Sequence, residues 1–468
     1  MRILNRGIRP CALFFLCVTS ALHLPAQTFT TLHNFGYADG AYPNSTLVQD
    51  TDGNFYGVTG NGGTNPANAG TVFKITPSGT LTTFYTFCSL HDCFDGAAPS
   101  AALLQSTDGN LYGTTYYGGA RQEGTVFKIT PTGKLTTLHS FCTQGDCTDG
   151  DQPDVGLARA TTGSFYGTTE YGGANMDGEV YRITSSGVLK VIHSFNSLDG
   201  EFPWGVIQAT DGNFYGTTQN GGAFFRYGTV FKITPSGALT TLHSFDGTDG
   251  AYLTAGLVQA SDGNFYGTTS SGGANQYYGT VFKITPSGTL TVLHSFDGAD
   301  GNYPSSVLLQ ATDGNFYGTT IYGGTFNDGT IFKITPDGTL TVLHSFNGAD
   351  GEYPYGGLMQ ATDGSFYGTT SNGGAYENYG TVFSLSVGLA PFVETNPGAG
   401  KVGAKIFILG SDLTGATSVT FNGAPAVFTL VSKTFIRATV PSGATTGIVQ
   451  VTAPGGTLSS NVVFRVLP

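Results

Sequence analysis

Asp262-Gly263-Asn264-Phe265-Tyr266-Gly267 joins a tight-turn signal to an alternating aromatic strand, and this segment or a near variant occurs seven times in the chain. The copies begin at Asp52, Asp108, Thr162, Asp211, Asp262, Asp313 and Asp363. Two further landmarks recur seven times beside it: variants of Gly-Thr-Val-Phe-Lys-Ile and of Leu-His-Ser-Phe. Three landmarks with a common period of about fifty residues indicate a repeat architecture.

Each repeat contains four strand-like runs. In the fifth copy they cover 256–260, 264–269, 280–285 and 290–296. Asp262-Gly263 supplies the turn between the first two runs, and Pro286-Ser287-Gly288 supplies the turn between the last two. Four antiparallel strands in about fifty residues are typical of one blade of a β-propeller.

The two ends of the repeat region predict a closed ring. The N-terminal run 29–35 has the sequence of a fourth strand, whereas the last repeat ends at Val382-Phe383-Ser384-Leu385, its third strand. Together they complete one blade and remove two open sheet edges. A linear solenoid would instead need capping repeats of different composition. We therefore predict an all-β fold: a seven-bladed β-propeller over residues 27–388, closed by the N-terminal strand.

Residues 389–468 leave the repeat pattern. They contain short alternating runs such as Ile406-Phe407-Ile408-Leu409 and Ile448-Val449-Gln450-Val451, which are broken by Gly and Pro. This pattern predicts a small immunoglobulin-like β-sandwich. Because 388–390 is too short for a long linker, we expect the two domains to lie close together.

The first 26 residues have the pattern of an export signal. Arg2, Arg6 and Arg9 precede a largely apolar run over 11–24, and a cleavage point follows near Ala26. Its removal moves the formal charge from −12 to −15. An acidic chain without a basic run is a poor ligand for nucleic acid. We expect an exported monomer with no nucleic-acid partner and no membrane insertion after signal removal.

Four cysteines remain in the predicted mature chain, in two pairs of identical spacing. Cys88 and Cys93 lie in one repeat, and Cys142 and Cys147 lie at the matching place of the next. In an oxidising compartment this pattern predicts two local disulfides, Cys88–Cys93 and Cys142–Cys147. A shared metal site is the alternative, but neither pair has a Cys or His partner at the spacing of zinc sites.

The repeat resembles the GloVer-type tandem repeats of exported bacterial proteins, through its Asp-Gly-Asn-Phe-Tyr-Gly-Thr-Thr, Gly-Gly-Ala and Val-Phe-Lys-Ile-Thr-Pro-Ser-Gly elements. This resemblance implies an extracellular or surface location and brings no catalytic residues with it. The tail resembles the IPT/TIG immunoglobulin-like domain, through residues that include Pro397, Gly410, Phe421-Asn422-Gly423 and Pro454-Gly455-Gly456. Such domains usually act as spacers, packing partners or modest binding modules.

Candidate functional residues are expected on the face that carries the long connections, those between the second and third strands and those between blades. Positions just before the innermost strands should ring the mouth of the central channel, and among them are Asn44, Asp154, Trp204 and Tyr355. The second-to-third loops add Tyr116, Tyr117, Phe225, Arg226, Tyr227, Tyr277, Tyr278 and Tyr322. Aromatic rings beside polar groups suit a glycan or a protein partner.

Two repeated residue types have a structural as well as a functional interpretation. Six histidines occupy the Leu-His-Ser-Phe position on the outermost strand, where residues of different blades cannot converge on one ligand. A repeated Asp-Gly in the connections between blades indicates a turn. Calcium is the alternative where two Asp lie close together, at Asp246 and Asp249 and at Asp297 and Asp300, although calcium needs six to eight oxygen ligands. We therefore predict no cofactor, with calcium as the alternative.

Three functions are compatible with the sequence. Binding of a glycan or protein partner by an exported protein is the first, and we assign no catalytic residues. A lyase or hydrolase at the channel mouth is the second, for which Asp154 and Arg159 are the nearest candidates. No nucleophile elbow, His-Glu-x-x-His, phosphate loop or Cys-x-x-Cys occurs. A purely structural role in the cell envelope is the third.

Overall fold

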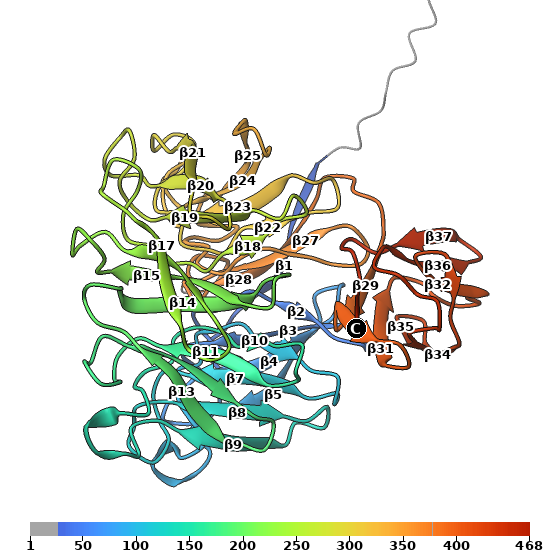
Figure 1. Cartoon of the computed structure of the whole chain (residues 1–468), viewed down its shortest axis with the longest axis horizontal. Coiled ribbons are helices and arrows are strands. Elements are labelled where there is room, and N and C mark those ends of the chain that lie inside the picture. Colours follow the sequence, from blue (N-terminus) through green and yellow to red (C-terminus); the bar gives the residue numbers. More distant parts are fainter. Residues whose placement is uncertain (1–26, 377) are drawn as a thin grey trace, which may run out of the picture.

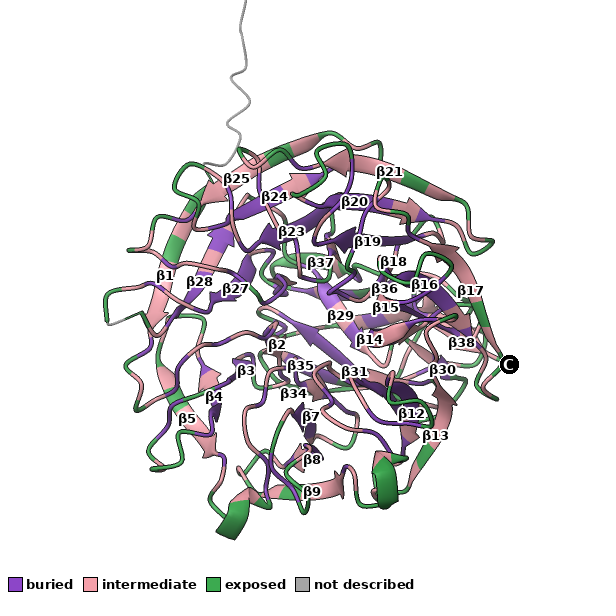
Figure 2. Ribbon diagram, turned by 90° about the vertical axis from the view of Figure 1, so that its left-hand side faces the viewer, coloured by how far each residue is buried: buried purple, intermediate pink, exposed green. Residues whose placement is uncertain are grey.

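The computed structural model describes residues 27–376 and 378–468. Its repeat region forms seven four-stranded antiparallel sheets arranged around one axis, and a second all-β domain lies on one side of the ring (Figures 1 and 2). The predicted β-propeller fold is confirmed. No helix among the described residues is long and apolar enough to span a membrane. The predicted export signal over 1–26 lies outside the described residues.

Blades 1 to 7 are numbered in chain order, and each runs from an inner to an outer strand. The innermost strands are β2 (Val48–Gln49), β6 (Leu104–Gln105), β10 (Ala158–Arg159), β14 (Glu201–Gln208), β18 (Val258–Gln259), β22 (Leu309–Gln310) and β26 (Met359–Gln360). The second strands are β3 (Phe55–Thr59), β7 (Leu111–Thr115), β11 (Phe165–Thr169), β15 (Phe214–Asn220), β19 (Phe265–Thr269), β23 (Phe316–Thr320) and β27 (Phe366–Thr370).

The third strands are β4 (Thr71–Ile75), β8 (Thr125–Ile129), β12 (Glu179–Ile183), β16 (Thr229–Ile233), β20 (Thr280–Ile284), β24 (Thr330–Ile334) and β28 (Thr381–Ser386). The outermost strands are β5 (Leu81–Thr86), β9 (Leu135–Ser140), β13 (Leu189–Ser194), β17 (Leu239–Ser244), β21 (Leu290–Ser295), β25 (Leu340–Ser345) and β1 (Thr28–Asn34). β1 pairs antiparallel with β28, so the N-terminal strand completes blade 7 as the sequence predicts.

The Phe-Tyr pair of the repeat seals neighbouring blades together. Because side chains alternate across a strand, Phe and Tyr point to opposite faces of each sheet. The Tyr of one blade therefore meets the Phe of the next, as where the rings of Tyr266 and Phe316 stack with centroids 4.0 Å apart. The next residue is Gly267, where a larger side chain does not fit because a Cβ there would lie 2.7 Å from the ring of Phe282. The core is thus a series of inter-blade layers, which explains the buried second and third strands (Figure 2).

The Asp of the repeat organises the turn before this strand. Asp262 accepts a hydrogen bond from the backbone N–H of Asn264 at 3.0 Å and another from the Tyr266 hydroxyl at 3.0 Å. Lys283 of the third strand reaches the same carboxylate at 2.9 Å. Gly263 has φ +82°, a left-handed conformation that favours glycine. The Asp-Gly-Asn-Phe-Tyr-Gly segment therefore specifies both the turn and the packing between blades.

The C-terminal domain is a β-sandwich. One sheet orders β29 (Val393–Asn396), β31 (Lys405–Gly410), β35 (Phe435–Thr439) and β34 (Phe428–Ser432), and the other orders β33 (Ala424–Pro425), β32 (Ser418–Phe421), β36 (Val449–Ala453) and β37 (Gly456–Ser459). β30 (Ala399–Lys401) pairs in parallel with β38 (Arg465–Leu467). The core between the sheets is aliphatic and aromatic and includes Ile406, Ile436, Val449 and Phe464.

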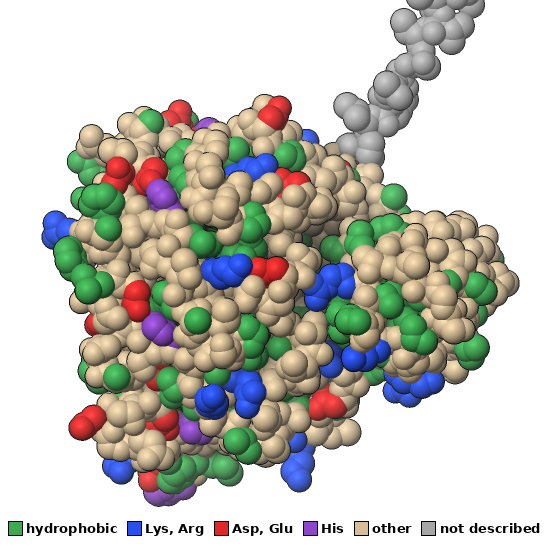
Figure 3. All heavy atoms as spheres, in the orientation of Figure 1, with side chains coloured by type: hydrophobic (Ala, Val, Ile, Leu, Met, Phe, Trp, Pro, Cys, Tyr) green, Lys and Arg blue, Asp and Glu red, His purple; other side chains and the backbone are tan. Residues whose placement is uncertain are grey.

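The C-terminal domain lies against the propeller face that carries the short turns, here named the turn face (Figures 1 and 3). The Phe392 N–H and the Ser411 hydroxyl both donate to the carbonyl of Thr362 in blade 7, at 3.0 and 3.1 Å. The Thr434 hydroxyl donates to the carbonyl of Thr51 in blade 1 at 3.0 Å. Seen from the opposite face, its strands lie behind the middle of the ring (Figure 2).

One detail differs from the sequence-based expectation. The innermost run predicted over 256–260 is a regular strand only at Val258–Gln259. Single 3-10 turns, η1 (His91–Cys93) and η2 (Gly145–Cys147), form in the loops that the two cysteine pairs close. A closed loop of six residues favours such a compact turn, and the signal for it is the cysteine spacing rather than helical periodicity.

Candidate functional site

The face opposite the C-terminal domain carries the second-to-third loops and the connections between blades, and is here named the long-loop face. It points to the left in Figure 1 and toward the viewer in Figure 2. Within the described part of the chain, one backbone hydrogen bond forms at each of the seven seams between neighbouring blades. It joins the connection that enters a blade to the second-to-third loop of the blade before it. In the seam between blades 4 and 5, the Tyr252 N–H donates to the Tyr227 carbonyl at 3.1 Å. The seams therefore present the same backbone with different side chains.

The residue that donates this bond has a left-handed backbone in every seam. These residues are Tyr42, Ala98, Gln152, Phe202, Tyr252, Tyr303 and Tyr353, with φ between 51° and 60°. Such a φ is costly for a residue other than Gly. Because it recurs in all seven seams, it serves the joining of blades. The side chains, in contrast, are free to vary, and four of the seven are Tyr.

A cavity of about 470 Å³ opens at the seam between blades 4 and 5. Tyr227, Tyr252 and Tyr277 contribute its aromatic walls. Asp246, Thr248 and Gln276 contribute polar groups. Tyr277 is 72% exposed and Tyr252 is 37% exposed, so their rings are available to a ligand. Tyr227 and Tyr277 belong to the sequence-predicted set, whereas Tyr252 was missed.

From this cavity a row of tyrosines continues along the long-loop face toward blade 7. Tyr227 and Tyr252 have ring centroids 6.5 Å apart. Tyr303 lies 6.2 Å from Tyr322, which lies 5.2 Å from Tyr353. The Tyr303 N–H donates to the Tyr278 carbonyl at 3.1 Å, and Tyr278 follows the cavity residue Tyr277 in the chain. We name these six residues the tyrosine arc: Tyr227, Tyr252, Tyr278, Tyr303, Tyr322 and Tyr353.

Carboxylates gather on another part of the same face, at blades 2 and 3. Glu170 accepts a hydrogen bond from the Tyr116 hydroxyl at 3.0 Å, and Asp154 accepts one from Ser100. Burial, together with the charge of Glu170, raises the pKa of Asp154 to about 6. Burial and the neighbouring Glu123 raise the pKa of Asp151 to about 7. Glu123, Asp151, Asp154 and Glu170 are here named the acidic cluster.

The predicted channel-mouth residues do not form one contact group. Trp204 lies on β14 and donates from its indole N–H to Gln219 at 3.3 Å. Tyr355 is 39% exposed and lies beside Tyr322 at the end of the tyrosine arc. Asn44 is half-buried, and its side-chain oxygen has no hydrogen-bond partner among the described residues. Asp154 belongs to the acidic cluster, so the four residues contribute to different parts of the face.

The other predicted loop residues divide between these regions. Tyr117 is 49% exposed and packs edge-on against Tyr116 near the acidic cluster, with centroids 4.7 Å apart. Phe225 and Arg226 are exposed at the tip of the blade 4 loop. Tyr278 and Tyr322 belong to the tyrosine arc. Tyr303 and Tyr353 were missed because they follow a landmark and precede Pro, a position that looks like part of the repeated scaffold.

The repeated His and Asp residues pair with each other. His243 and Asp249 are 2.7 Å apart, and His294 and Asp300 are 2.6 Å apart, with the same pairing in four further repeats. Asp246 accepts hydrogen bonds from the N–H and hydroxyl of Thr248, and Asp297 accepts one from the Ala299 N–H. No group of three or more His, Cys, Asp or Glu in the described part of the chain could hold a metal ion. Calcium at these Asp pairs stays a prediction.

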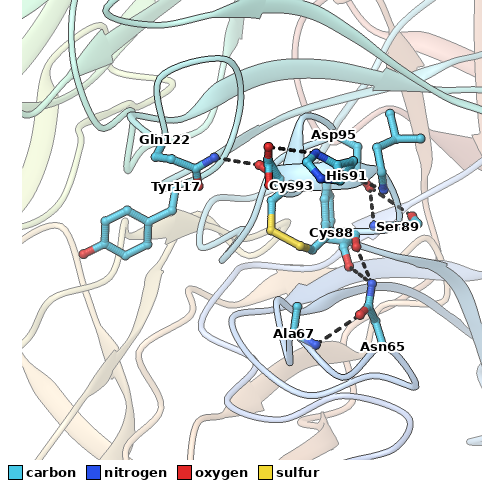
Figure 4. The surroundings of a disulfide bond; sticks show 12 residues. Asn65, Ala67, Cys88, Ser89, His91, Cys93, Asp95, Tyr117 and Gln122 are labelled. Atoms are coloured by element: carbon cyan, nitrogen blue, oxygen red, sulfur yellow. Dashed lines mark hydrogen bonds and ion pairs between the residues drawn. A yellow bond between two sulfur atoms is a disulfide. The ribbon is translucent and has the colours of Figure 1, made fainter.

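Both predicted disulfides are confirmed, Cys88–Cys93 and Cys142–Cys147. Figure 4 shows that the first closes a loop held from both sides. Asn65 donates to the Phe87 carbonyl at 3.3 Å, and Gln122 donates to the Asp92 carbonyl at 2.6 Å. The disulfides thus fix two neighbouring loops at the rim of the long-loop face.

The two residues considered for catalysis lie at opposite ends of the blade 3 inner strand. Asp154 is on the long-loop face, whereas Arg159 donates to Thr107 at 2.7 Å and to Asn396 of the C-terminal domain at 3.4 Å. The structure therefore places the two residues on opposite faces of the ring. Arg159 instead belongs to the contact between the domains.

Solved structures share the fold at low sequence identity. A virginiamycin B lyase from Staphylococcus aureus aligns with a TM-score of 0.51 and 15% identity, over 77% of this chain and 99% of that one. The extracellular domain of a one component system from B. thetaiotaomicron aligns with a TM-score of 0.53 and 12% identity, over 93% of this chain and 48% of that one. No curated protein sequence matches the chain.

Family models account for nearly the whole described chain. The Gloeobacter/Verrucomicrobia repeat matches residues 18–225 and 203–392, and the IPT/TIG domain matches residues 393–466. The chain belongs to the Gloeobacter/Verrucomicrobia repeat family and ends in an IPT/TIG domain.

Proposed function

We propose that this protein is an exported surface-interaction protein whose long-loop face binds a glycan. The cavity between blades 4 and 5 carries the proposal, because it combines aromatic walls with carboxylate, hydroxyl and amide groups. Aromatic rings can stack on the C–H faces of sugars, while the polar groups accept and donate hydrogen bonds to their hydroxyls. Two disulfides in the loops of this face fit an oxidising location outside the cytoplasm.

The proposal is tested by titrating the protein with a panel of neutral, cationic and anionic oligosaccharides and measuring heat of binding. We expect a saturable signal that weakens at least tenfold in Tyr252→Ala and Tyr277→Ala. Tyr117→Ala, which removes a ring of intermediate exposure elsewhere on the face, should bind as the wild type does. No binding across the panel would contradict the proposal, and capture of a protein ligand by the same face would replace it.

Catalysis at the acidic cluster is a second candidate function. The raised pKa values of Asp151 and Asp154 keep part of both carboxyl groups protonated near neutral pH, as a general acid requires. If this function holds, chromatography of the panel after incubation should show products that disappear with Asp154→Asn while ligand binding persists. Unchanged oligosaccharides after prolonged incubation would exclude catalysis on this panel and leave binding as the only proposed function.

A further inference from the structure

The tyrosine arc extends well beyond the cavity between blades 4 and 5. It consists of two groups of contacts. At the cavity, Tyr227 and Tyr252 form a ring pair; beyond it, a backbone bond joins Tyr278 to Tyr303, and ring pairs run from Tyr303 through Tyr322 to Tyr353. Tyr278 follows the cavity residue Tyr277 in the chain, so the second group begins beside the cavity. The exposed rings of Tyr277 and Tyr355 stand beside its two ends. A single sugar can occupy only one part of such a row.

Neighbouring rings of the arc are steeply inclined to each other. The interplanar angle is 63° for Tyr227 and Tyr252, 74° for Tyr303 and Tyr322, and 65° for Tyr322 and Tyr353. The arc therefore offers a succession of separate faces rather than one flat platform. This arrangement suits a chain of sugar rings that turn relative to one another along the chain.

The charge around the arc selects against acidic ligands. Three acidic side chains, Asp328, Asp350 and Glu352, lie near one another at the blade 7 end of the arc, and two of them, Asp328 and Glu352, lie beside Tyr353. Several repeat lysines are tied to carboxylates at the turn face, as in Lys232–Asp211 at 2.9 Å. Arg226 is exposed beside Tyr227 at the cavity end, but an anionic chain that extends to blade 7 would approach these acidic side chains.

We propose that the tyrosine arc is a row of subsites for an extended, uncharged polysaccharide chain that crosses blades 4 to 7. This inference rests on the proposed glycan-binding function and specifies its ligand class. The cavity holds one segment of the chain, and the rings from Tyr278 to Tyr353 hold the following segments. Affinity then depends on chain length, because each further sugar reaches a further aromatic face.

The test uses two matched series: α-1,4-linked glucose oligomers of two to six units, whose rings turn at each linkage, and the same oligomers with every unit oxidised at C6 to glucuronate. We expect the neutral hexamer to bind at least tenfold more tightly than the neutral dimer, and the glucuronate hexamer to bind more weakly than either. Tyr252→Ala and Tyr355→Ala, at opposite ends, should each weaken hexamer binding about tenfold. Tyr117→Ala is the control outside the arc.

The outcomes separate this inference from the proposed function. Equal affinities for all neutral lengths would overturn the subsite row while leaving glycan binding in place. Tighter binding of the glucuronate series would overturn the uncharged ligand class alone. Absence of binding by both series would overturn the inference, and if the wider oligosaccharide panel also failed, the proposed function would fall with it. Circular dichroism of each variant distinguishes lost binding from lost folding.

Discussion

At the scale of single residues, blade 3 departs from a polar contact that the other six blades share. In those blades, a Thr on the second strand and a Thr on the third strand join their hydroxyls, as do Thr269 and Thr280 at 2.9 Å. Blade 3 has Glu179 in the second of these positions. Glu179 is 0% exposed, and neither side-chain oxygen has a hydrogen-bond partner among the described residues.

The burial of Glu179, with a contribution from Asp149, raises its pKa to about 9. Between about pH 5 and 9 the folded protein therefore keeps a proton that the unfolded chain releases, and stability falls as pH rises. We expect Glu179→Gln to remove this dependence. The free energy of unfolding of the variant should therefore rise relative to that of the wild type by up to about 1.4 kcal/mol per pH unit across this window. Urea unfolding at several pH values measures the difference.

Tyr181→Phe is the matched control for this prediction. Its buried hydroxyl also lacks a partner in the described part of the chain, and the other six blades have Phe there. Its loss should stabilise the protein by about 1 kcal/mol without changing the slope of stability against pH. Parallel curves for the wild type and Glu179→Gln would show that Glu179 is ionised in the fold.

At the scale of elements, ring closure depends on β1. Phe29 on this strand stacks on His344 with ring centroids 3.8 Å apart, and it also contacts Phe383 at 5.4 Å. It thereby fastens the first strand of the chain to the outer strand of blade 6 and the third strand of blade 7. The sequence predicted this closure because the two ends of the repeat region complement each other.

Phe29→Ala should destabilise the protein by about 2 kcal/mol, because it removes the half-buried ring that seals the closing blade. Thr30→Ala, at an exposed position of the same strand, should change stability by less than about 0.5 kcal/mol. Hydrogen exchange should also accelerate in blade 7 of the Phe29 variant before it does in blades 3 and 4. Uniform acceleration around the ring would argue against a local closure by β1.

At the scale of the whole molecule, the C-terminal domain contacts blades spread around the ring. Besides blades 1 and 7, it reaches blade 2 through Asn396, whose amide donates to the Gln105 carbonyl at 3.2 Å. Arg465 donates to the Thr210 carbonyl in blade 4. Several contacts end on backbone carbonyls. Every residue has a backbone carbonyl, so these contacts cannot be recognised from residue types. The sequence therefore predicted that the domains lie close together but not that the C-terminal domain docks on the turn face.

Because these contacts span several blades, we expect the two domains to unfold in one calorimetric transition. Arg159→Ala combined with Arg465→Ala removes two of the side chains that join them. This double variant should lower the melting temperature or resolve a second transition. Two separate transitions in the wild type would show that the domains are energetically independent.

The site could be predicted only in part, for a related reason. Repetition identified the blades, the long-loop face and both disulfides, since each depends on residues that recur in register. The tyrosine arc depends on pairs from different repeats, such as Tyr227 with Tyr252 and Tyr322 with Tyr353. Only the seam geometry shows that such residues meet. The first pair joins the residue before the loop Gly of one repeat, Tyr227, to a residue of the next repeat at a position that precedes Pro in the other six repeats but precedes Leu253 here.

The most direct test of the central claim, that the long-loop face is the ligand surface, is hydrogen–deuterium exchange with and without the neutral glucose hexamer. We predict slower exchange in the segments 223–228, 246–253, 271–279 and 302–304, which carry the cavity and part of the tyrosine arc. The turn face and the IPT/TIG domain should exchange as before. Protection confined to the turn face and the IPT/TIG domain, or no protection at a saturating hexamer concentration, would show that the long-loop face is not the ligand surface.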